Sequence, residues 1–240
     1  MTVITVLFVF ILLWVIVNSL AYIIAAVFCH VFDKNNVFQK WTGECKTSQS
    51  NSNVKVSDGF KQNLRSYVQG YINYMLYRTS IIPSFQIRNF LYRKVFKVKA
   101  THRTVFYSKI EIRSPWNVKI GDSVIGSESK LDGRFGVTIG NHVTLSNNTC
   151  IWTDEHDVND PWFRGNDKSG PVTIGDYAWL SSRSTILPKI HVGEGTVLAS
   201  GAIATSDLKP YKIYVGVPAK DKGERLKTLY YDNCYKRHIW

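Results

Sequence analysis

The apolar positions of the chain form two separate patterns, and the first is a continuous run at the N-terminus. Residues 2–32 contain no Lys, Arg, Asp or Glu, and residues 1–32, as a helix rising about 1.5 Å per residue, measure roughly 48 Å. A bilayer core needs only about 20 apolar residues. A cleaved signal peptide has a basic start and an apolar core of about 7–15 residues, and this run has neither. We predict an uncleaved membrane anchor over 1–32, in which Asn18 and Ser19 are the place where a kink or a re-entrant hairpin could occur.

The second pattern is a six-residue repeat. Nine units, in two in-phase runs, begin with an aliphatic residue, and six of them carry a small residue at the fifth position. A helix repeats about every 3.6 residues and a strand about every 2, so this period indicates a parallel β-helix of triangular section, with three short strands per coil. Looser units upstream place its start near residue 105. The leading residues, which we expect to point inward, are Ile139, Leu145, Ile151, Ile174, Leu180, Ile186, Val192, Leu198 and Ala204.

Residues 33–104 lie between these two patterns. The Ser- and Asn-rich stretch 46–59 predicts a linker. After it, large aromatic and aliphatic residues at helical spacing alternate with basic ones, which is typical of helices at a membrane surface. The same pattern fits a helical cap packed on the following domain, with the aromatic residues in its core. The residues concerned are Phe60, Leu64, Tyr67, Tyr71, Tyr74, Leu76 and Tyr77.

The distribution of charge supports a membrane partner. Of the formal +12 carried by the 240 residues, +9 lies in residues 33–99, which hold twelve basic and three acidic residues. Basic residues beside an apolar span favour the cytoplasmic side, so we expect residues 33–240 in the cytoplasm. A basic aromatic segment also suits nucleic acid, but no helix-turn-helix, RNP or zinc motif accompanies it. The four cysteines form no CxxC pair, which argues against a disulfide scaffold or a structural zinc site.

The chain therefore divides into a membrane anchor (1–32), a linker and basic amphipathic helical region (33–104), a β-helix domain (105–220) and a capping tail (221–240). The tail carries aromatic and charged residues at helical spacing, and we expect it to cover the open end of the β-helix or to pack on a neighbour. The six-residue period breaks once, over residues 157–173, directly after His156. Solenoids carry such insertions on one face, often the binding face.

These repeats carry a family resemblance. The (I/L/V)-G-x-x-(small)-x units, the loop at His156 and the segment VGVPAK (215–220) resemble the hexapeptide-repeat acyltransferases, and among them most of all the maltose and galactoside O-acetyltransferases and the acetyltransferases of colanic acid and capsule synthesis. The resemblance covers residues 80–226. It implies a mainly β protein, a left-handed parallel β-helix with flanking α-helices, which is an exception to the usual right-handed crossover. It also implies a homotrimer that binds acetyl-CoA, as co-substrate and without a metal, between neighbouring subunits.

The resemblance assigns the catalytic base to His156. A sugar hydroxyl is a poor nucleophile toward a thioester, and an imidazole takes its proton during direct attack. The developing oxyanion then needs N–H or hydroxyl donors. Among the neighbouring acids Asp154, Glu155 and Asp157, we choose Asp157 as the carboxylate that orients the imidazole. In the insertion, Trp162, Phe163 and Arg164 are candidates for the acceptor pocket, because aromatic faces and a guanidinium suit sugar rings and acidic groups.

The galactoside acetyltransferase pattern carries over without gaps from Ile174 to Lys220. The positions that it assigns to acetyl-CoA are Trp179, Ser182, Ser200, Thr205, Ser206 and Lys220. Ser206 stands where the family has a lysine, and Lys220 where it has an arginine, so a phosphate would meet one point charge in place of a planar fork. Lys222 and Arg225 are candidates to compensate. The acceptor-side asparagine of the family has no clear counterpart, because residues 127–136 align poorly.

The expected function is acetyl-CoA-dependent O-acetylation of a saccharide hydroxyl in cell-surface polysaccharide or glycolipid biosynthesis, with a lipid-linked glycan as an acceptor that a membrane-anchored enzyme would meet. N-acetylation of an amino sugar nucleotide and a non-enzymatic trimeric scaffold are alternatives, and an acyl chain longer than acetyl stays open. A hexapeptide-repeat carbonic anhydrase would need His142, His156 and His191 to converge on zinc. These three histidines stand at unequal positions of their units, which argues against that site.

Overall fold

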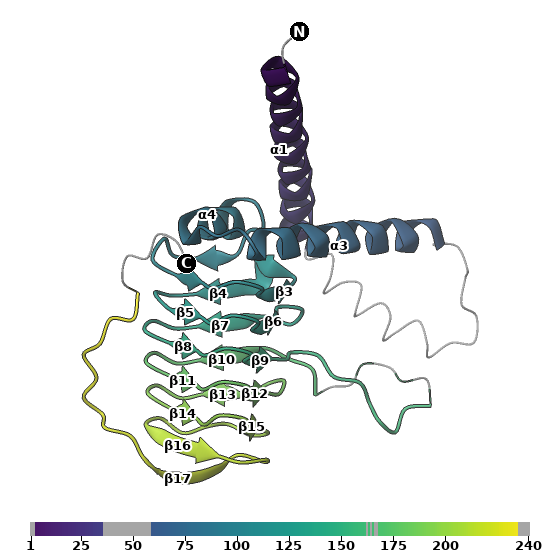
Figure 1. Cartoon of the computed structure of the whole chain (residues 1–240). Coiled ribbons are helices and arrows are strands. Elements are labelled where there is room, and N and C mark those ends of the chain that lie inside the picture. Colours follow the sequence, from purple (N-terminus) through teal and green to yellow (C-terminus); the bar gives the residue numbers. More distant parts are fainter. Residues whose placement is uncertain (1–2, 36–58, 162, 164, 166–167, 235–240) are drawn as a thin grey trace.

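Three faces of short parallel strands form the body of the molecule, a β-helix of about six coils (Figure 1). The computed structural model describes residues 3–35, 59–161, 163, 165 and 168–234. The first face consists of β1 (Lys99–Ala100), β4 (Val118–Ile120), β7 (Val137–Ile139), β10 (Val172–Ile174) and β13 (His191–Val192). The second face consists of β2 (Val105–Phe106), β5 (Val124–Ile125), β8 (Thr144–Leu145), β11 (Trp179–Leu180), β14 (Val197–Leu198), β16 (Lys212–Val215) and β17 (Lys220–Glu224). The third face consists of β3 (Glu111–Arg113), β6 (Lys130–Asp132), β9 (Cys150–Ile151), β12 (Thr185–Ile186) and β15 (Ile203–Ala204).

The six-residue period is the packing period of this β-helix, as predicted. All nine leading residues are buried, and leading residues one coil apart are paired, as Leu145 is with Leu180. Small residues at the fifth position, such as Ala178 and Thr196, are also fully buried. Because each coil repeats the one before it, equivalent side chains stack in columns, and burying one large aliphatic side chain contributes about 1.5–3 kcal/mol. The predicted parallel β-helix is confirmed.

Glycine after a leading residue lets neighbouring coils approach closely at the corners. A Cβ atom on Gly175 would lie 2.7 Å from the backbone nitrogen of Glu194, and one on Gly193 would lie 2.5 Å from that of Pro210. Such separations are shorter than any van der Waals contact of carbon. A side chain at either position would therefore push two coils apart.

Two helices cover the end of the β-helix that carries β1, β2 and β3, and we call them the end cap. They are α3 (Gly59–Ser80) and α4 (Phe85–Lys94), whose N-cap is Ser84. The buried Arg88 of α4 donates from Nε to the carbonyl oxygen of Phe106 at 3.0 Å and from Nη1 to that of Ile82. Burial lowers the pKa of this guanidinium. Buried residues of both helices, among them Met75 and Tyr92, belong to the hydrophobic core. The β-helix begins at Lys99, earlier than the predicted residue 105.

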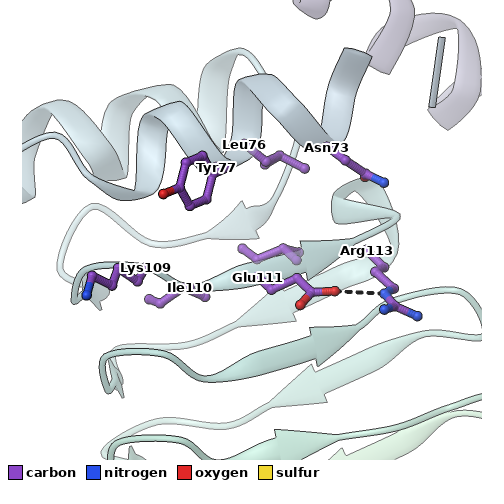
Figure 2. A pocket seen from close by; sticks show the side chains of 8 residues that line it. Asn73, Leu76, Tyr77, Lys109, Ile110, Glu111 and Arg113 are labelled. Carbon is purple, nitrogen blue, oxygen red and sulfur yellow. Dashed lines mark hydrogen bonds and ion pairs between the residues drawn. The ribbon is translucent and has the colours of Figure 1, made fainter. Parts of the chain in front are cut away.

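A hollow of about 370 Å³ lies between α3 and the first strand of the third face (Figure 2). Its lining residues are Asn73, Leu76 and Tyr77 of α3, and Lys109, Ile110, Glu111, Ile112 and Arg113 of the first coil. Arg113 donates from Nε to Glu111 at 2.9 Å, and its guanidinium lies 5.6 Å from the ring centre of Trp152 in the third coil. Lys109 pairs with Glu128 outside the hollow at 3.4 Å, so each charged side chain of the lining has a partner of opposite charge.

The N-terminal helix α1 (Val3–Asn35) projects from the end cap (Figure 1). It is continuous through Asn18 and Ser19, so the structure has no re-entrant hairpin there. Among the residues that the structure describes, Val6–Val31 is the one helical segment long and apolar enough to cross a membrane. Its second half packs on α3, where Tyr71 donates to the carbonyl oxygen of Ala21 at 2.8 Å, and it also contacts the 3₁₀ turn Pro115–Asn117.

At the other end of the β-helix, β17 pairs antiparallel with β16 and ends the second face. The described part of the C-terminal tail, residues 225–234, is extended, so the helical spacing read from the sequence was misleading there. The tail runs back along the corner between the first and second faces, toward the end cap (Figure 1). Arg225 donates to the carbonyl oxygens of Tyr177 at 2.8 Å and Gly195 at 3.2 Å, both at this corner.

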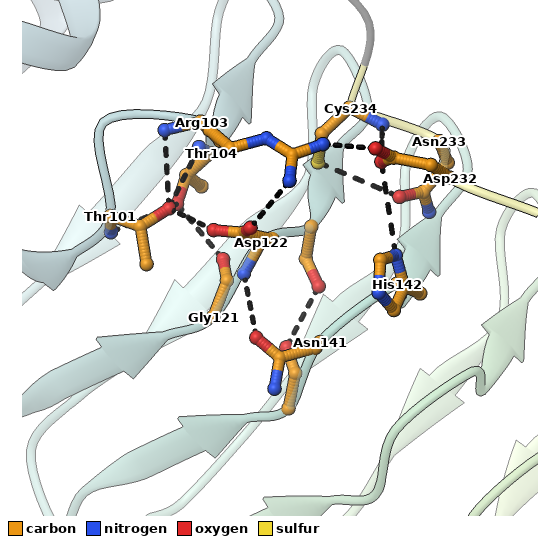
Figure 3. A network of polar contacts seen from close by, with 12 residues as sticks. Thr101, Arg103, Thr104, Gly121, Asp122, Asn141, His142, Asp232, Asn233 and Cys234 are labelled. Carbon is orange, nitrogen blue, oxygen red and sulfur yellow. Dashed lines mark hydrogen bonds and ion pairs between the residues drawn. The ribbon is translucent and has the colours of Figure 1, made fainter.

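The tail is fixed near the end cap by a polar network (Figure 3). Asp232 pairs with Arg103, which also donates to Asp122 at 3.1 Å. Asn233 donates to the carbonyl oxygen of Val143 at 3.0 Å. These contacts join the tail to coils one to three, so the tail ties several coils together along one corner.

Candidate active site

The insertion 157–173 leaves the β-helix in its third coil, at the corner between the third and first faces. It follows β9 and precedes β10 (Figure 1). The register of the third face is unaffected, because Cys150 still pairs with Lys130 in the preceding coil and with Thr185 in the next. The insertion therefore projects from a coil whose strands are paired with the coils before and after it.

His156 stands at the start of this insertion and is exposed. It forms an antiparallel bridge with Gly165. Its Nδ1 atom lies 2.7 Å from the carbonyl oxygen of Phe163, and the two rings stack with centroids 4.3 Å apart and planes 8° apart. A carbonyl oxygen only accepts hydrogen bonds. Nδ1 of the neutral ring is therefore the donor, and the lone pair lies on Nε2, the tautomer in which Nε2 serves as a base.

The carboxylate of Asp157, chosen from the sequence to orient this imidazole, has a different partner in the structure. Its Oδ1 accepts from the backbone N–H of Asn159 at 2.9 Å, as in a turn at the start of a loop. The contact at Nδ1 of His156 comes from the Phe163 carbonyl oxygen. The ring orientation in this structure is thus set within the insertion by backbone and stacking.

Asp154 joins a network that holds the insertion to the coil before it. Its Oδ2 accepts from Arg134 at 2.5 Å, and its Oδ1 accepts from Ser169 at 2.8 Å. Arg134 also donates from Nε and Nη2 to Asp132, each at 2.8 Å. Ser169 in turn accepts from the backbone N–H of Glu155 at 2.9 Å. The network therefore holds both ends of the insertion by hydrogen bonds, at residues 154–155 and at residue 169.

The centre of this network is a buried ion pair. Asp132 has no exposed side-chain area, and Arg134 is about one quarter exposed, at 23%. Burial by itself would raise the pKa of Asp132, but the hydrogen bonds and charge of Arg134 outweigh it, and the pKa lies below its usual value. Burial likewise acts to lower the pKa of Arg134, and Asp132 and Asp154 raise it overall. Both groups are therefore charged at neutral pH.

Sequence reasoning missed Asp132, Arg134 and Ser169. The first two fall in the stretch 127–136, which aligned poorly with the family pattern. A signal was present in the repeat itself. Asp132 and Thr153 occupy the same corner one coil apart, and Thr153 accordingly donates to the Asp132 carbonyl oxygen at 2.8 Å. Polar residues at equivalent corners of adjacent coils lie in contact. Polar residues at this corner in the coil before the insertion were therefore candidates for contacts with it.

Of the three acceptor-pocket candidates, Phe163 is described and lies against His156. Its φ is +50°, in the left-handed region that non-glycine residues rarely adopt. Trp162 and Arg164 lie outside the described residues. The position of Phe163 gives it a direct part in shaping the surroundings of the imidazole.

The residues expected to bind acetyl-CoA lie on two corners and one face of the β-helix. Ser182 and Ser200 follow β11 and β14, at the corner between the second and third faces. Thr205 and Ser206 follow β15, at the same corner as the His156 insertion but two coils away. The remaining two residues, Trp179 and Lys220, lie on strands β11 and β17 of the second face.

A shallow hollow of about 400 Å³ lies on the second face beside these residues. It is lined by Ser182 and Ser146, among others, and Ser146 accepts from the indole N–H of Trp179 at 3.1 Å. The hydroxyl of Ser200 lies 2.7 Å from that of Ser181. Thr205, Ser206 and Lys220 are exposed. The predicted cofactor residues are thus accessible, but a single chain does not gather all of them into one groove.

The three histidines of the carbonic anhydrase alternative do not converge. His142 stacks on Tyr177 at the corner between the first and second faces, with ring centroids 4.8 Å apart. His191 lies on β13, with Nδ1 2.6 Å from the Thr173 hydroxyl. His156 stands at a different corner. Within the described ranges, no three His, Cys, Asp or Glu side chains come together as a metal site.

Comparison with known proteins gives sequence relatives among acetyltransferases. No protein-family model matches the chain. The chain is 29% identical over 142 residues to an Escherichia coli K12 protein named as the colanic acid biosynthesis acetyltransferase WcaF, which covers 59% of this chain and 76% of that protein. It is 34% identical over 108 residues to a protein of Staphylococcus aureus MRSA252 named as an acetyltransferase, and spans about half of its length, 54%.

Solved structures share the fold. A maltose O-acetyltransferase of Clostridium difficile 630 superposes with a TM-score of 0.59 at 22% identity, over 68% of this chain and 89% of that one. A hexapeptide-repeat acetyltransferase of Vibrio cholerae, solved with acetyl coenzyme A, superposes with a TM-score of 0.60 at 18% identity, over 77% of this chain and 99% of that one. The sequence relatives, the six-residue period and the shared β-helix confirm the resemblance noted in the sequence: the chain is an acetyltransferase that is similar to the hexapeptide-repeat acyltransferases.

Proposed function

We propose that this enzyme transfers an acetyl group from acetyl-CoA to a saccharide hydroxyl in the biosynthesis of a cell-surface polysaccharide or glycolipid, with His156 as the general base. The observation that carries the proposal is the contact between the His156 ring and the carbonyl oxygen of Phe163. Nδ1 donates to the Phe163 carbonyl oxygen at 2.7 Å, so Nε2 is the ring atom with a lone pair. His156 directly precedes the one insertion in the predicted repeats and is exposed there, so an acceptor can reach its ring.

The proposed reaction is a direct transfer. The acceptor oxygen attacks the thioester carbonyl carbon while Nε2 of His156 takes the hydroxyl proton. The carbon–sulfur bond of the tetrahedral intermediate then breaks, and the imidazolium returns the proton to the departing CoA sulfur. His156 ends in its starting form, and the products are the acetyl ester and CoA. The Phe163 carbonyl oxygen stabilises the imidazolium in between, because it accepts the Nδ1–H bond in both protonation states.

Acetyl-CoA would bind between two subunits of a trimer. The support is the separation of the predicted cofactor residues, since Ser182 and Ser200 lie on one corner of the β-helix and the His156 insertion lies on another. A neighbouring subunit that packs its corner against this insertion would complete the site. Trp179, exposed on the second face, and Lys220 would meet the adenosine and phosphate parts of the co-substrate.

The anchor would hold this site at the cytoplasmic side of a membrane. Supporting observations are the apolar segment Val6–Val31 and the basic region that follows it in the sequence. An enzyme held there meets glycans that are carried on membrane lipids, and the E. coli relative is named for colanic acid biosynthesis. We therefore place a lipid-linked glycan first among the acceptors.

The proposal is tested by incubating the purified full chain with labelled acetyl-CoA and three acceptor classes: lipid-linked glycans, free saccharides and amino sugar nucleotides. We expect label in a saccharide, and mass spectrometry should locate the new acetyl group on oxygen. An acetylated nitrogen would favour the alternative activity. Absence of transfer to every acceptor, with acetyl-CoA still bound, would favour a scaffold.

A further inference from the structure

The outer side of α4 exposes large apolar side chains to the surroundings. The residues of α4 that face the β-helix are Phe85, Arg88, Asn89 and Tyr92, all buried. On the opposite side of the same helix, Ile87 is 51% exposed and Phe90 is 57% exposed, with the exposed Lys94 one turn farther on. These three positions are spaced by three and four residues, so they form one stripe. The stripe has no partner among the described residues.

The direction of this stripe follows from how α4 is held. Arg88 reaches the Phe106 carbonyl oxygen and Asn89 reaches that of Thr104 at 2.7 Å, so the inner side of α4 points into the first coil. The stripe therefore points away from the stack of coils. Figure 1 shows that α1 projects from the molecule at this same end, roughly along the stack.

The contact between α1 and α3 marks a level on the apolar helix. Asn18 accepts from Nη2 of Arg78 at 2.6 Å, and the Arg78 guanidinium lies 5.9 Å from the ring centre of Tyr74. Every residue from Leu7 to Val17 is exposed, and a helix that is apolar all round needs an apolar environment on all sides. A guanidinium beside an aromatic ring suits the interface between water and hydrocarbon. Ile23 and Val27, on the other side of Asn18, are also more than half exposed, so the boundary of the hydrocarbon lies at the level of the end cap, where α1 packs on α3.

Basic residues predominate at this end of the molecule, where Arg103 and Lys109 pair with acidic side chains of other segments. Residues 59–110, which contain α3, α4 and the first two strands, hold ten basic residues and no acidic residue. A basic surface with exposed apolar and aromatic side chains is the pattern of proteins that lie on anionic bilayers. This surface lies at the end of the molecule from which the apolar half of α1 projects. We therefore infer that its partner is the bilayer and not another protein.

We propose that the end cap lies on the surface of an anionic membrane through Ile87, Phe90 and Lys94, and that the β-helix stands upright on the bilayer. The position of the active site follows from this orientation. Coils stack about 4.8 Å apart, so the third coil lies about 10 Å from the first, and the cap adds about 10 Å. The His156 insertion is then held roughly 20 Å from the membrane surface. The orientation is independent of the proposed function. Only the use of this height to choose an acceptor rests on that function.

The orientation is tested with the full chain in vesicles of phosphatidylcholine and phosphatidylglycerol that contain brominated lipid. In a variant without native cysteines, checked for its circular dichroism spectrum, single cysteines replace Phe90, Val158 or Leu226 and carry a fluorescent label. Val158 lies in the insertion and Leu226 in the tail, and both are highly exposed. We expect loss of emission at position 90 alone. Emission that stays unchanged at position 90, or that is quenched equally at 158, would overturn the orientation.

A second measurement guards against damage to the fold. We expect the double variant Ile87→Asp, Phe90→Asp to lose activity toward a lipid-linked glycan while it keeps its activity toward the same glycan in water. The matched control is Leu226→Asp, which should behave like the parent chain toward both. Equal loss toward both acceptors would contradict a docking role. Failure of the parent chain to acetylate either acceptor would contradict the proposed function, while the quenching result would still decide the orientation.

Discussion

The Nδ1 atom of His156 lies 2.7 Å from the carbonyl oxygen of Phe163, and the two rings stack at 4.3 Å. One residue therefore contributes both a hydrogen-bond acceptor and a flat surface to the proposed base. The acceptor is a backbone atom, so most substitutions at Phe163 keep it. The stacking surface belongs to the side chain and is removed by truncation. This difference separates the two contributions experimentally.

Replacement of the base should abolish most of the transfer. We expect His156→Ala to reduce kcat by about 10²–10⁴-fold, the usual contribution of a general base. His156→Gln retains polarity and similar size but takes no proton at neutral pH, so it should be equally slow. The measurement is the initial rate with labelled acetyl-CoA, together with thermal unfolding to show that both variants are folded. Undiminished transfer by His156→Ala would remove the histidine from the mechanism.

Truncation of the stacked ring should slow the enzyme moderately. An aromatic pair contributes about 0.5–1.5 kcal/mol beyond its buried area, so we expect Phe163→Ala to lower kcat by roughly 2–10-fold. Phe163→Tyr keeps the ring and should restore the rate. The control for a general effect on the loop is the KM for acetyl-CoA, which should stay constant in both variants. A rate for Phe163→Ala equal to that of the parent chain would show that the stack has no part in catalysis.

Asp157 can now be tested separately from the backbone contact. Its Oδ1 accepts from the Asn159 N–H, and an amide oxygen accepts the same bond. We therefore expect Asp157→Asn to keep kcat within about threefold, which corresponds to less than one hydrogen bond. A loss as large as that of His156→Ala would return the orienting role to the carboxylate, as the sequence alone suggested. Rates across pH 6–9 are the measurement.

Sequence periodicity predicted the β-helix well because each inward position recurs, as Leu145 and Leu180 do in adjacent coils. It could not predict the partners of Arg134, since contact between Arg134 and Asp154 depends on the number of residues in the intervening coil. The extended tail was misread because its aromatic residue Tyr231 contacts a corner of the β-helix, at Tyr177, and forms no helical core. The spacing of residues along the sequence therefore predicts contacts that recur in every coil, and it does not predict contacts that occur at a single place in the fold.

The buried pair Asp132–Arg134 should make stability depend on pH in a defined direction. The folded-state pKa of Asp132 is lowered, so its contribution is complete above the unfolded value of about 3.9 and is lost as pH falls below that through the folded value. We expect Asp132→Asn to lower the unfolding free energy by about 2–4 kcal/mol at pH 7, because it removes the fully buried one of the two carboxylates that pair with Arg134. The difference from the parent chain should shrink below about pH 4.

The measurement for this pair is denaturant unfolding of the detergent-solubilised chain from pH 7 to pH 3. Asp221→Asn is a suitable control, since Asp221 forms an exposed ion pair with Lys212 at 3.4 Å, and exposed pairs contribute about 0–1 kcal/mol. A constant difference between Asp132→Asn and the parent chain at every pH would contradict the assigned charge state. Activity should fall together with stability, because Arg134 also holds Asp154.

A shared active site should allow two inactive variants to complement each other. His156 and Ser200 lie at different corners of one chain, so in a trimer they would meet across a subunit boundary. We expect Ser200→Trp, which fills the proposed groove, to raise the KM for acetyl-CoA steeply while its folding is retained. Mixed trimers of Ser200→Trp and His156→Ala subunits should then regain part of the parental activity. Mixtures as inactive as either variant alone, in confirmed mixed trimers, would place the whole site within one chain.

The upright orientation makes the length of a lipid-linked acceptor matter. With the His156 insertion roughly 20 Å from the bilayer, a single sugar attached directly to a lipid phosphate would stay in the headgroup layer, below the site. We expect transfer to rise sharply once the glycan has several sugars and then to level off. The same glycans released from the lipid should show a much weaker length dependence, because they approach the site freely. Rates over a series of lipid-linked glycans test this directly. Equal rates for the shortest and longest members would mean that the β-helix lies flat or that the acceptor leaves the membrane.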